Sequence, residues 1–306
     1  MEKLIITAAI TGGSSPQGNP YLPKSPKEQV QSAIDAWNAG ASVIHIHGRN
    51  PSTGEPDHVA DYLGEAIAGI RQGSDVLVNC TTGGTAHRMD LDWLYKEIPK
   101  ESVKGRFQVI ADLSRHVDTK PDLASFNAGS PVIDIYSRGK DEFLLKFVMV
   151  HTFDDMRYGA RVLKECGVKP EIECYDVGMI SNAVLLRDSG DLEDPLYFDF
   201  VLGVIGQIPA TVENVTHMYH SIPQGSPWSA CAVGLAEWPM ITTAILLGGN
   251  VRVGFEDNIY LSRGVPAKTN AEMVEKAVRI ARELDREIAS PEEARAMLRL
   301  PPAALR

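Results

Sequence analysis

A closed (β/α)8 barrel, or TIM barrel, is the fold that this sequence predicts, and three observations favour it. Eight short β-branched runs occur along the chain, and stretches with the apolar period of a helix separate most of them. The chain has 306 residues, which is the usual size of such a barrel. No linker, low-complexity tract or sequence repeat divides it. An open, doubly wound sheet is the alternative, because a strand count does not establish closure.

The expected elements follow one another in a regular order. The first strand is expected at residues 4–10 and the first helix at 25–40, where Ser25 and Pro26 are typical of a helix cap and a first turn. The other strands are expected at 42–47, 75–80, 122–129, 171–176, 196–203, 227–234 and 250–255. The other helices are expected at 58–73, 154–167, 179–190, 237–249 and 270–285.

One segment interrupts this rhythm. Residues 85–121 lie between the third and fourth expected strands, and they contain a strand-like run, RFQVIADLS, at 106–114. A simple barrel has no place for this extra element. We therefore interpret 85–121 as an insertion after the third strand, within a single domain that spans residues 1–306.

The composition is that of an ordinary globular protein, with 44% hydrophobic and 23% charged residues. The formal net charge of -10 gives no electrostatic support to a nucleic-acid partner. No apolar run reaches the roughly 18–20 residues of a membrane span. The start of the chain lacks a basic leader, and the four cysteines show no CxxC pair. We therefore expect a cytoplasmic protein whose partners are small molecules.

The second expected strand carries two histidines in the pattern VIHIH. Side chains alternate along a strand, so His45 and His47 share a face among apolar neighbours. Strand ends form the active-site face of a TIM barrel, and two neutral imidazoles there suit zinc. A catalytic zinc commonly takes three protein ligands, so a third is expected from another strand end. The alternative is one hydrogen-bonded core histidine beside one exposed histidine.

The last expected strand continues into NVRVGFEDN, at 250–258, which offers the third ligand. Arg252 and Glu256 have the same parity, and Gly254 leaves room between them. Glu256 would complete a site of two histidines and one glutamate. Asp257 has the opposite parity and reaches the same cavity only if the chain turns at the strand end. A structural ion pair that closes the barrel is the alternative for these residues.

Three further strand ends carry small, polar residues typical of a ligand pocket, although each alone is also typical of a turn. They are ITGGSS at 10–15, TTGG at 81–84 and SFNAGS at 125–130. Glycine lets a ligand approach the backbone, while Thr81, Ser125 and Asn127 offer short side-chain donors. Glu171 and Glu173 share a parity on the fifth strand. We interpret them as support for the arginine of the last strand or for a metal, with barrel-interior ion pairs as the alternative.

Together these motifs resemble those of the β-keto acid cleavage enzymes, and the resemblance covers nearly the whole chain. It rests on ITAAITG, VIHIH, TTGG, FNAG, PEIECYDVGM, FVLG and GGNVRVGFEDNIY. The resemblance implies a zinc-containing TIM barrel, usually a homotetramer. It also implies a reaction that condenses a β-keto acid with acetyl-CoA and releases acetoacetate and a new CoA thioester.

The resemblance also implies roles for individual residues. The metal ligands are His45, His47 and Glu256. The catalytic base is Asp257, oriented by Arg252. The substrate-contacting positions are Ser14, Thr81, Gly84, Ser125 and Asn127.

Ser14 is a departure within that set. Where a family member acts on an amino-substituted keto acid, a glutamate follows the first strand, but this chain has Ser14. A short hydroxyl does not neutralise an ammonium group. We therefore expect a keto acid whose tail is neutral or hydroxylated.

Two other functions are alternatives. A zinc hydrolase of the amidohydrolase type also uses an HxH pair in a barrel, but it normally needs further histidines and an aspartate on later strands. In those hydrolases the HxH pair also lies on the first strand, whereas in this chain it lies on the second. A metal-stabilised barrel that only binds small acids is the other alternative. Arg49, just beyond the histidines, is a candidate contact for a CoA phosphate, with a solvated loop residue as the alternative.

Overall fold

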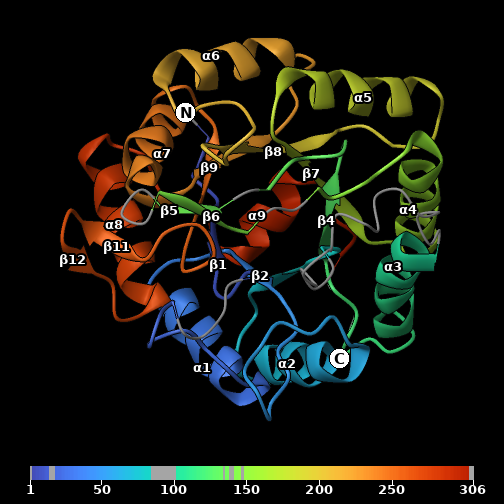
Figure 1. The fold of residues 1–306 in the computed structure, drawn as a ribbon, viewed down its shortest axis with the longest axis horizontal. Helices are drawn as coiled ribbons and strands as arrows, with labels where there is room; N and C mark the ends of the chain where they lie inside the picture. The colour runs from blue at the N-terminus through green and yellow to red at the C-terminus, as the bar shows by residue number, and fades with distance from the viewer. Residues whose placement is uncertain are drawn as a thin grey trace.

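The computed structural model describes residues 2–13, 18–83, 101–133, 135–137, 141–145 and 148–302. Eight parallel strands close into a barrel, so the predicted fold is confirmed and the open sheet is excluded (Figure 1). Each barrel strand pairs with the next one along the chain, and the last pairs with the first. The barrel strands are β1 (Ile6–Ala9), β2 (Val43–Ile46), β3 (Leu77–Cys80), β4 (Leu123–Asn127), β7 (Lys169–Cys174), β8 (Tyr197–Leu202), β9 (Trp228–Ala232) and β10 (Asn250–Val253). Each overlaps its predicted range.

Helices surround the barrel in Figure 1, and two small hairpins form separate two-stranded sheets that are not part of the barrel. The helices of the described residues are α1 (Pro26–Asn38), α2 (Ala60–Gly73), α3 (Glu101–Leu113), α4 (Phe153–Cys166), α5 (Val177–Asp188), α6 (Val212–Ser221), α7 (Glu237–Leu246), α8 (Asn270–Glu283) and α9 (Pro291–Met297). The hairpins are β5 (Ile135–Ser137) with β6 (Glu142–Leu145), and β11 (Tyr260–Ser262) with β12 (Val265–Pro266). The predicted cap of α1 is present, because the Ser25 side chain accepts a hydrogen bond from the Glu28 amide.

The helices α6 and α9 were not predicted from the sequence, and α3 forms where a strand-like run was expected. The run at 106–114 was expected to be strand-like, but α3 covers nearly all of it. Its buried residues Phe107, Ile110 and Leu113 are three positions apart, which is the spacing of one helix face. Because α3 stands between β3 and β4, residues 101–113 form the third helix of the barrel and not an insertion. Residues 84–100 of the predicted insertion lie outside the described residues.

The packing of α3 against α4 makes a testable prediction. A Cβ atom added at Gly159 of α4 would collide with the buried ring of Phe107. We expect Gly159→Ala to destabilise the protein by about 1–3 kcal/mol, as overpacking of a core does. Gly105→Ala is the matched control on α3, where an added Cβ meets nothing within 4 Å. Alanine is the better helix former there, so urea unfolding should show about 0.5–1 kcal/mol of stabilisation. Equal effects of the two substitutions would contradict this packing.

One end of the barrel is closed by apolar residues. Ile5, just before β1, and the first residues of β2, β3, β4 and β8 pack with Ala294 of α9 and with Leu298, which follows that helix. Figure 1 shows α9 across the centre of the barrel. The apolar closure leaves the opposite end, where the strands terminate, for a functional site. Among the described residues, no helix combines the length and the apolar character needed to cross a bilayer.

Candidate active site

The barrel strands place polar residues on their inward face, whereas residues of the opposite face pack in the apolar core under the helices. Alternate residues such as Ile44, Ile46 and Val78 join the large apolar core that the helices cover. The residues between them include polar side chains that are at most 3% exposed, which are Thr7, His45, Asn79, Ser125, Glu171, Asp199, Ser229 and Arg252. Side-chain alternation therefore gathers polar groups inside the barrel.

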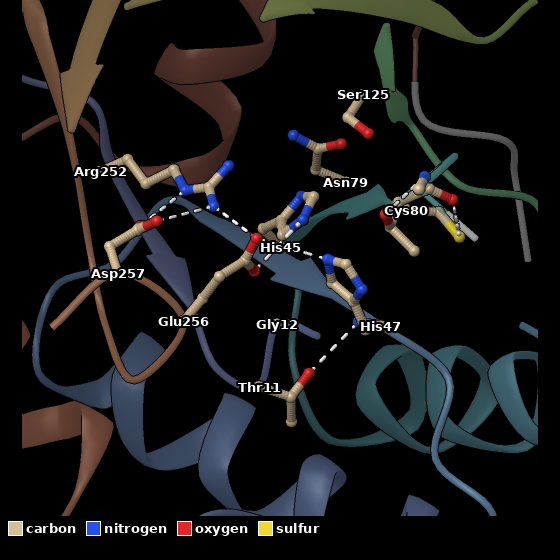
Figure 2. Close-up of polar contacts among 12 residues, drawn as sticks. Thr11, Gly12, His45, His47, Asn79, Cys80, Ser125, Arg252, Glu256 and Asp257 are labelled. Carbon is tan, nitrogen blue, oxygen red and sulfur yellow. Dashed lines mark hydrogen bonds and ion pairs between the residues drawn. The ribbon is translucent and has the colours of Figure 1, made fainter. Parts of the chain in front are cut away.

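The three predicted metal ligands meet at the strand ends. His45 Nε2 lies 3.4 Å from Glu256 Oε2, and His47 Nε2 lies 3.3 Å from Glu256 Oε1 (Figure 2). One ligand atom from each of the three residues lies within 4.8 Å of the others. His45 is buried, whereas His47 and Glu256 are half-buried. The cluster is thus supported by protein on one side and accessible on another.

This cluster fits a zinc ion. Two ligands at about 2.0–2.1 Å from a tetrahedral zinc are roughly 3.4 Å apart, close to the spacing seen between the imidazoles and Glu256. His45 Nε2 and Glu256 Oε2 are buried and have no hydrogen-bond partner among the described residues. A cation would satisfy both atoms, and leaving them without partners is costly.

The protonation states also suit a metal. Burial lowers the pKa of His45 to about 3, so its imidazole is neutral. Burial by itself would raise the pKa of Glu256, but the charge of the Arg252 guanidinium is the main effect that holds this pKa well below its usual range. Neutral imidazoles and an ionised carboxylate are the forms that bind a metal.

A turn after β10 places Glu256 and Asp257, so the strand parity used in the sequence analysis does not apply to them. The strand ends at Val253, and the amides of Asp257 and Asn258 both donate to the Gly254 carbonyl, at 3.0 Å. Gly254 has φ +141°, a backbone conformation that favours glycine. An added Cβ there would collide with the backbone of Ala9 on β1. The turn that Asp257 needs in order to reach the site is therefore present. Glu256 reaches the site through the same turn, and not through the side-chain alternation of a strand.

Arg252 holds Asp257 through two hydrogen bonds. Its Nε lies 2.9 Å from Asp257 Oδ2, and its Nη2 lies 3.1 Å from Asp257 Oδ1. The same guanidinium also contacts Glu256 Oε1, at 2.6 Å, and Glu173 Oε1, at 3.0 Å. Burial raises the pKa of Asp257 to about 7, although the Arg252 charge opposes this rise. Figure 2 shows the side chain of Asp257 beside those of Arg252 and Glu256.

The two glutamates of β7 have different partners. Glu173 contacts Arg252, as one interpretation of the sequence proposed, and burial raises the pKa of Glu173 to about 8. Glu171 accepts a short hydrogen bond from the Asn79 side chain on β3. Burial and the nearby Asp199 carboxylate raise the pKa of Glu171 well above its usual range. Neither glutamate joins the histidine cluster.

Thr81 and Ser125 lie at neighbouring strand ends with their hydroxyl oxygens already accepting hydrogen bonds. The Gly83 amide donates to Thr81 Oγ1, at 2.9 Å, and the Thr82 amide donates to Ser125 Oγ, at 3.1 Å. Each hydroxyl therefore keeps its own proton for a further acceptor. Asn127, at the end of β4, is buried, and its Oδ1 has no hydrogen-bond partner among the described residues. The other two predicted substrate contacts, Ser14 and Gly84, lie outside the described residues.

Arg49 does not reach a CoA phosphate, and the prediction that it does is wrong. Its side chain is fully buried and donates to the carbonyls of Thr11, Gly12 and Gly54, at 2.7–3.1 Å. Nor is it a solvated loop residue. Arg49 instead fixes the loop after β1 against the loop after β2.

Several supporting residues were missed by the sequence analysis. Thr11 Oγ1 accepts a hydrogen bond from the His47 amide, at 3.3 Å, and the Gln29 side chain donates to the His47 carbonyl, at 2.6 Å. Gln29 lies on α1, where no local pattern marks it. Asn79 is different, because an amide in the apolar run DVLVNC just before TTGG is a signal that sequence analysis can use.

Gly12 packs directly against Glu256, and this contact makes a second prediction. Gly12 has φ +62°, and a Cβ there would collide with Glu256 Cγ. We expect Gly12→Ala to cost about 1–3 kcal/mol of stability through backbone strain. By displacing Glu256, a predicted metal ligand, it should also weaken any zinc binding by about tenfold or more. Gly13→Ala is the control, since an added Cβ there meets nothing within 4 Å. Zinc titration of both variants checks this, and equal zinc affinities would contradict it.

Comparisons with known proteins agree with this geometry. A family model described as beta-keto acid cleavage enzyme matches residues 3–300. The chain belongs to the β-keto acid cleavage enzymes. It is 38% identical over 302 residues to a 3-keto-5-aminohexanoate cleavage enzyme of Fusobacterium nucleatum subsp. nucleatum, covering 98% of this chain and 99% of that protein. It is 34% identical over 301 residues to a 3-dehydrocarnitine:acetyl-CoA trimethylamine transferase of Rhizobium meliloti, covering 97% of each.

A solved structure supports the fold of this β-keto acid cleavage enzyme. The ternary complex of ObcA with a C4-CoA adduct and oxalate superposes with a TM-score of 0.72 at 20% identity, covering 92% of this chain and 68% of that one. This likeness concerns the fold alone. The family match makes the chain an enzyme, so the non-catalytic binding barrel and the amidohydrolase-type hydrolase are set aside.

Proposed function

We propose that this enzyme is zinc-dependent and transfers CoA from acetyl-CoA to a β-keto acid, giving acetoacetate and a new acyl-CoA. One observation carries the proposal. A partly buried cluster of two histidines and one glutamate, suited to zinc, lies beside an aspartate that an arginine holds in two hydrogen bonds. The choice of zinc is supported by the distances between the imidazole nitrogens and the Glu256 oxygens, and by the buried ligand atoms that have no hydrogen-bond partner among the described residues.

The reaction forms one carbon–carbon bond and breaks another. The α-carbon of the keto acid loses a proton and attacks the acetyl carbonyl of acetyl-CoA, releasing the CoA thiolate. The thiolate then adds to the β-carbonyl carbon, and the bond between the α- and β-carbons breaks. The α-carbon departs with its carboxylate and the acetyl group, and it takes back the proton from the base to give acetoacetate. The β-carbonyl carbon keeps CoA.

Protein groups supply the proton transfer and the positioning. Asp257 takes the α-proton, and the Arg252 charge keeps this carboxylate oriented and favours its ionised form. A divalent cation bound by His45, His47 and Glu256 would supply Lewis-acid polarisation of the keto acid oxygens. Thr81 and Ser125 donate their hydroxyl protons to the substrate carboxylate, because both hydroxyl oxygens already accept from backbone amides. Asn127, Gly84 and Ser14 complete the proposed substrate contacts.

The tail of the keto acid is proposed to be neutral or hydroxylated. Ser14 is the residue that supports this choice, since its hydroxyl does not neutralise an ammonium group. The two relatives are named for substrates with an amino group and with trimethylamine. Keto acids with both kinds of cationic tail therefore belong in the test.

The test is a panel of β-keto acids, with neutral, hydroxylated, amino and trimethylammonium tails, incubated with acetyl-CoA and zinc-loaded protein. Acetoacetate should form only when both substrates are present, and the neutral or hydroxylated acids should give the highest kcat/KM. Hydrolysis of the keto acid without acetyl-CoA would overturn the proposed reaction. A preference for the ammonium tails would overturn the tail assignment alone.

We also propose a homotetramer in the cytoplasm. The resemblance to the family supports the assembly, and light scattering should give the mass of about four 33.4 kDa chains. A monomeric mass at micromolar concentration would contradict this. The cytoplasmic location is supported by the four scattered cysteines, whose spacing does not suggest a disulfide framework.

A further inference from the structure

Asn79 lies beside the metal ligand His45 but has no role in the proposed reaction. β2 and β3 are paired in parallel register, and His45 is the direct partner of Asn79. Both side chains are buried, at 1% and 0% exposure. Figure 2 shows the amide of Asn79 next to the imidazole of His45. Paired residues of neighbouring strands are less than about 5.5 Å apart, within reach of a side-chain hydrogen bond.

Glu171 determines which end of the Asn79 amide faces the carboxylate. The Asn79 Nδ2 group donates to Glu171 Oε2 in a short hydrogen bond. An asparagine amide has one donating end and one accepting end, so this bond commits Oδ1 to the acceptor role elsewhere. This bond crosses β4, which lies between β3 and β7, and in the barrel register Leu123 is the partner of Asn79 while Ser125 is the partner of Glu171.

The atoms that remain on His45 and Asn79 are complementary. His45 directs Nε2 to Glu256, which leaves Nδ1 as the nitrogen on the other side of the ring. His45 Nδ1 and Asn79 Oδ1 are both buried, and neither has a hydrogen-bond partner among the described residues.

We propose that Asn79 is a positioning residue that accepts a hydrogen bond from the Nδ1–H group of His45. Glu171 orients the Asn79 amide, and Asn79 then selects the His45 tautomer whose Nε2 lone pair points at Glu256. This chain of contacts fixes the imidazole in the form that a zinc ion requires. The inference rests on the proposed function, because it assumes that the cluster of His45, His47 and Glu256 binds a metal.

Loss of Asn79 is expected to weaken zinc binding directly, and to affect the reaction only as a consequence. Partners that hold a ligating histidine typically change metal affinity by about 10- to 100-fold when they are removed. Asn79→Leu removes both polar ends of the amide at similar volume. We therefore expect zinc to bind this variant about 10- to 100-fold more weakly than the wild type, as measured by competition with a chromophoric chelator.

Asn250→Leu is the matched control. Asn250 is also a buried asparagine on a barrel strand, but within the described part of the chain its side chain bonds only to the backbone of Ile5 and Trp228. This control should lower the unfolding temperature while leaving zinc affinity within about twofold of the wild type. Comparable losses of zinc affinity in both variants would mean that the effect is general destabilisation, and the inference would fail.

A second variant and a spectroscopic readout cover the case in which Asn79→Leu does not fold. Glu171→Gln keeps the shape of the side chain but offers both a donor and an acceptor, so the Asn79 amide is free to flip. The imidazole nitrogen-15 shifts of the metal-free protein should show one Nδ1–H tautomer for His45 in the wild type and a mixture in Glu171→Gln. An unchanged tautomer together with unchanged zinc affinity would overturn the inference. Absence of zinc binding by the wild type would instead overturn the proposed metal site.

Discussion

Asp257→Asn is expected to reduce kcat by about 10²- to 10⁴-fold, which is the usual contribution of a positioned general base. The amide keeps the shape of the carboxylate and can still accept a hydrogen bond from Arg252, so the turn after β10 should keep its structure. An amide does not remove a proton from carbon at neutral pH. The loss should therefore appear in turnover, with KM for the keto acid changed much less.

Zinc content is the control for this variant. Asp257 lies next to Glu256 in the chain but is not a member of the metal cluster. Asp257→Asn should therefore bind about one zinc ion per chain, as the wild type is expected to do. Turnover that stays near the wild-type value would show that Asp257 is not the base. Loss of zinc together with turnover would show that the residue acts through the metal site.

His45→Ala should lose both zinc and activity. The substitution removes the most deeply buried of the three ligands and leaves Glu256 Oε2 without the neighbouring imidazole. Two remaining ligands do not make a catalytic zinc site, which normally has three. Elemental analysis of the purified variant should find zinc at less than about a tenth of the wild-type content, and added zinc should not restore acetoacetate formation.

His217→Ala is the matched substitution for this experiment. His217 is exposed on α6, outside the barrel wall, so its loss should change neither zinc content nor turnover. Removal of zinc from the wild-type protein with a chelator should abolish activity as His45→Ala does. Added zinc should restore the activity of the chelated wild type but not that of the variant. Full retention of zinc by His45→Ala would remove His45 from the ligand set.

Most of the barrel could be predicted because its signals are local. Each strand is a short β-branched run, and each amphipathic helix shows its apolar face within about three turns. The exceptions are segments whose local signal is weak or ambiguous. In α6 the only buried residues are Val215 and Met218, so its apolar stripe is short. In α3 the β-branched residues of the run at 106–114 suggested a strand, although the spacing of Phe107, Ile110 and Leu113 is helical.

The sequence by itself determined which residues can carry chemistry at the strand ends. Alternation within one strand puts His45 and His47 on one face, and the acidic pair after the last strand is a contiguous pattern. The tertiary structure alone decided how these groups meet. The turn at Gly254 brings Glu256 and Asp257 over the barrel, Arg49 is buried under the loop after β1, and the register of β2 with β3 sets Asn79 beside His45. Strand pairing and closure join residues far apart in the chain, and a local pattern does not specify such contacts.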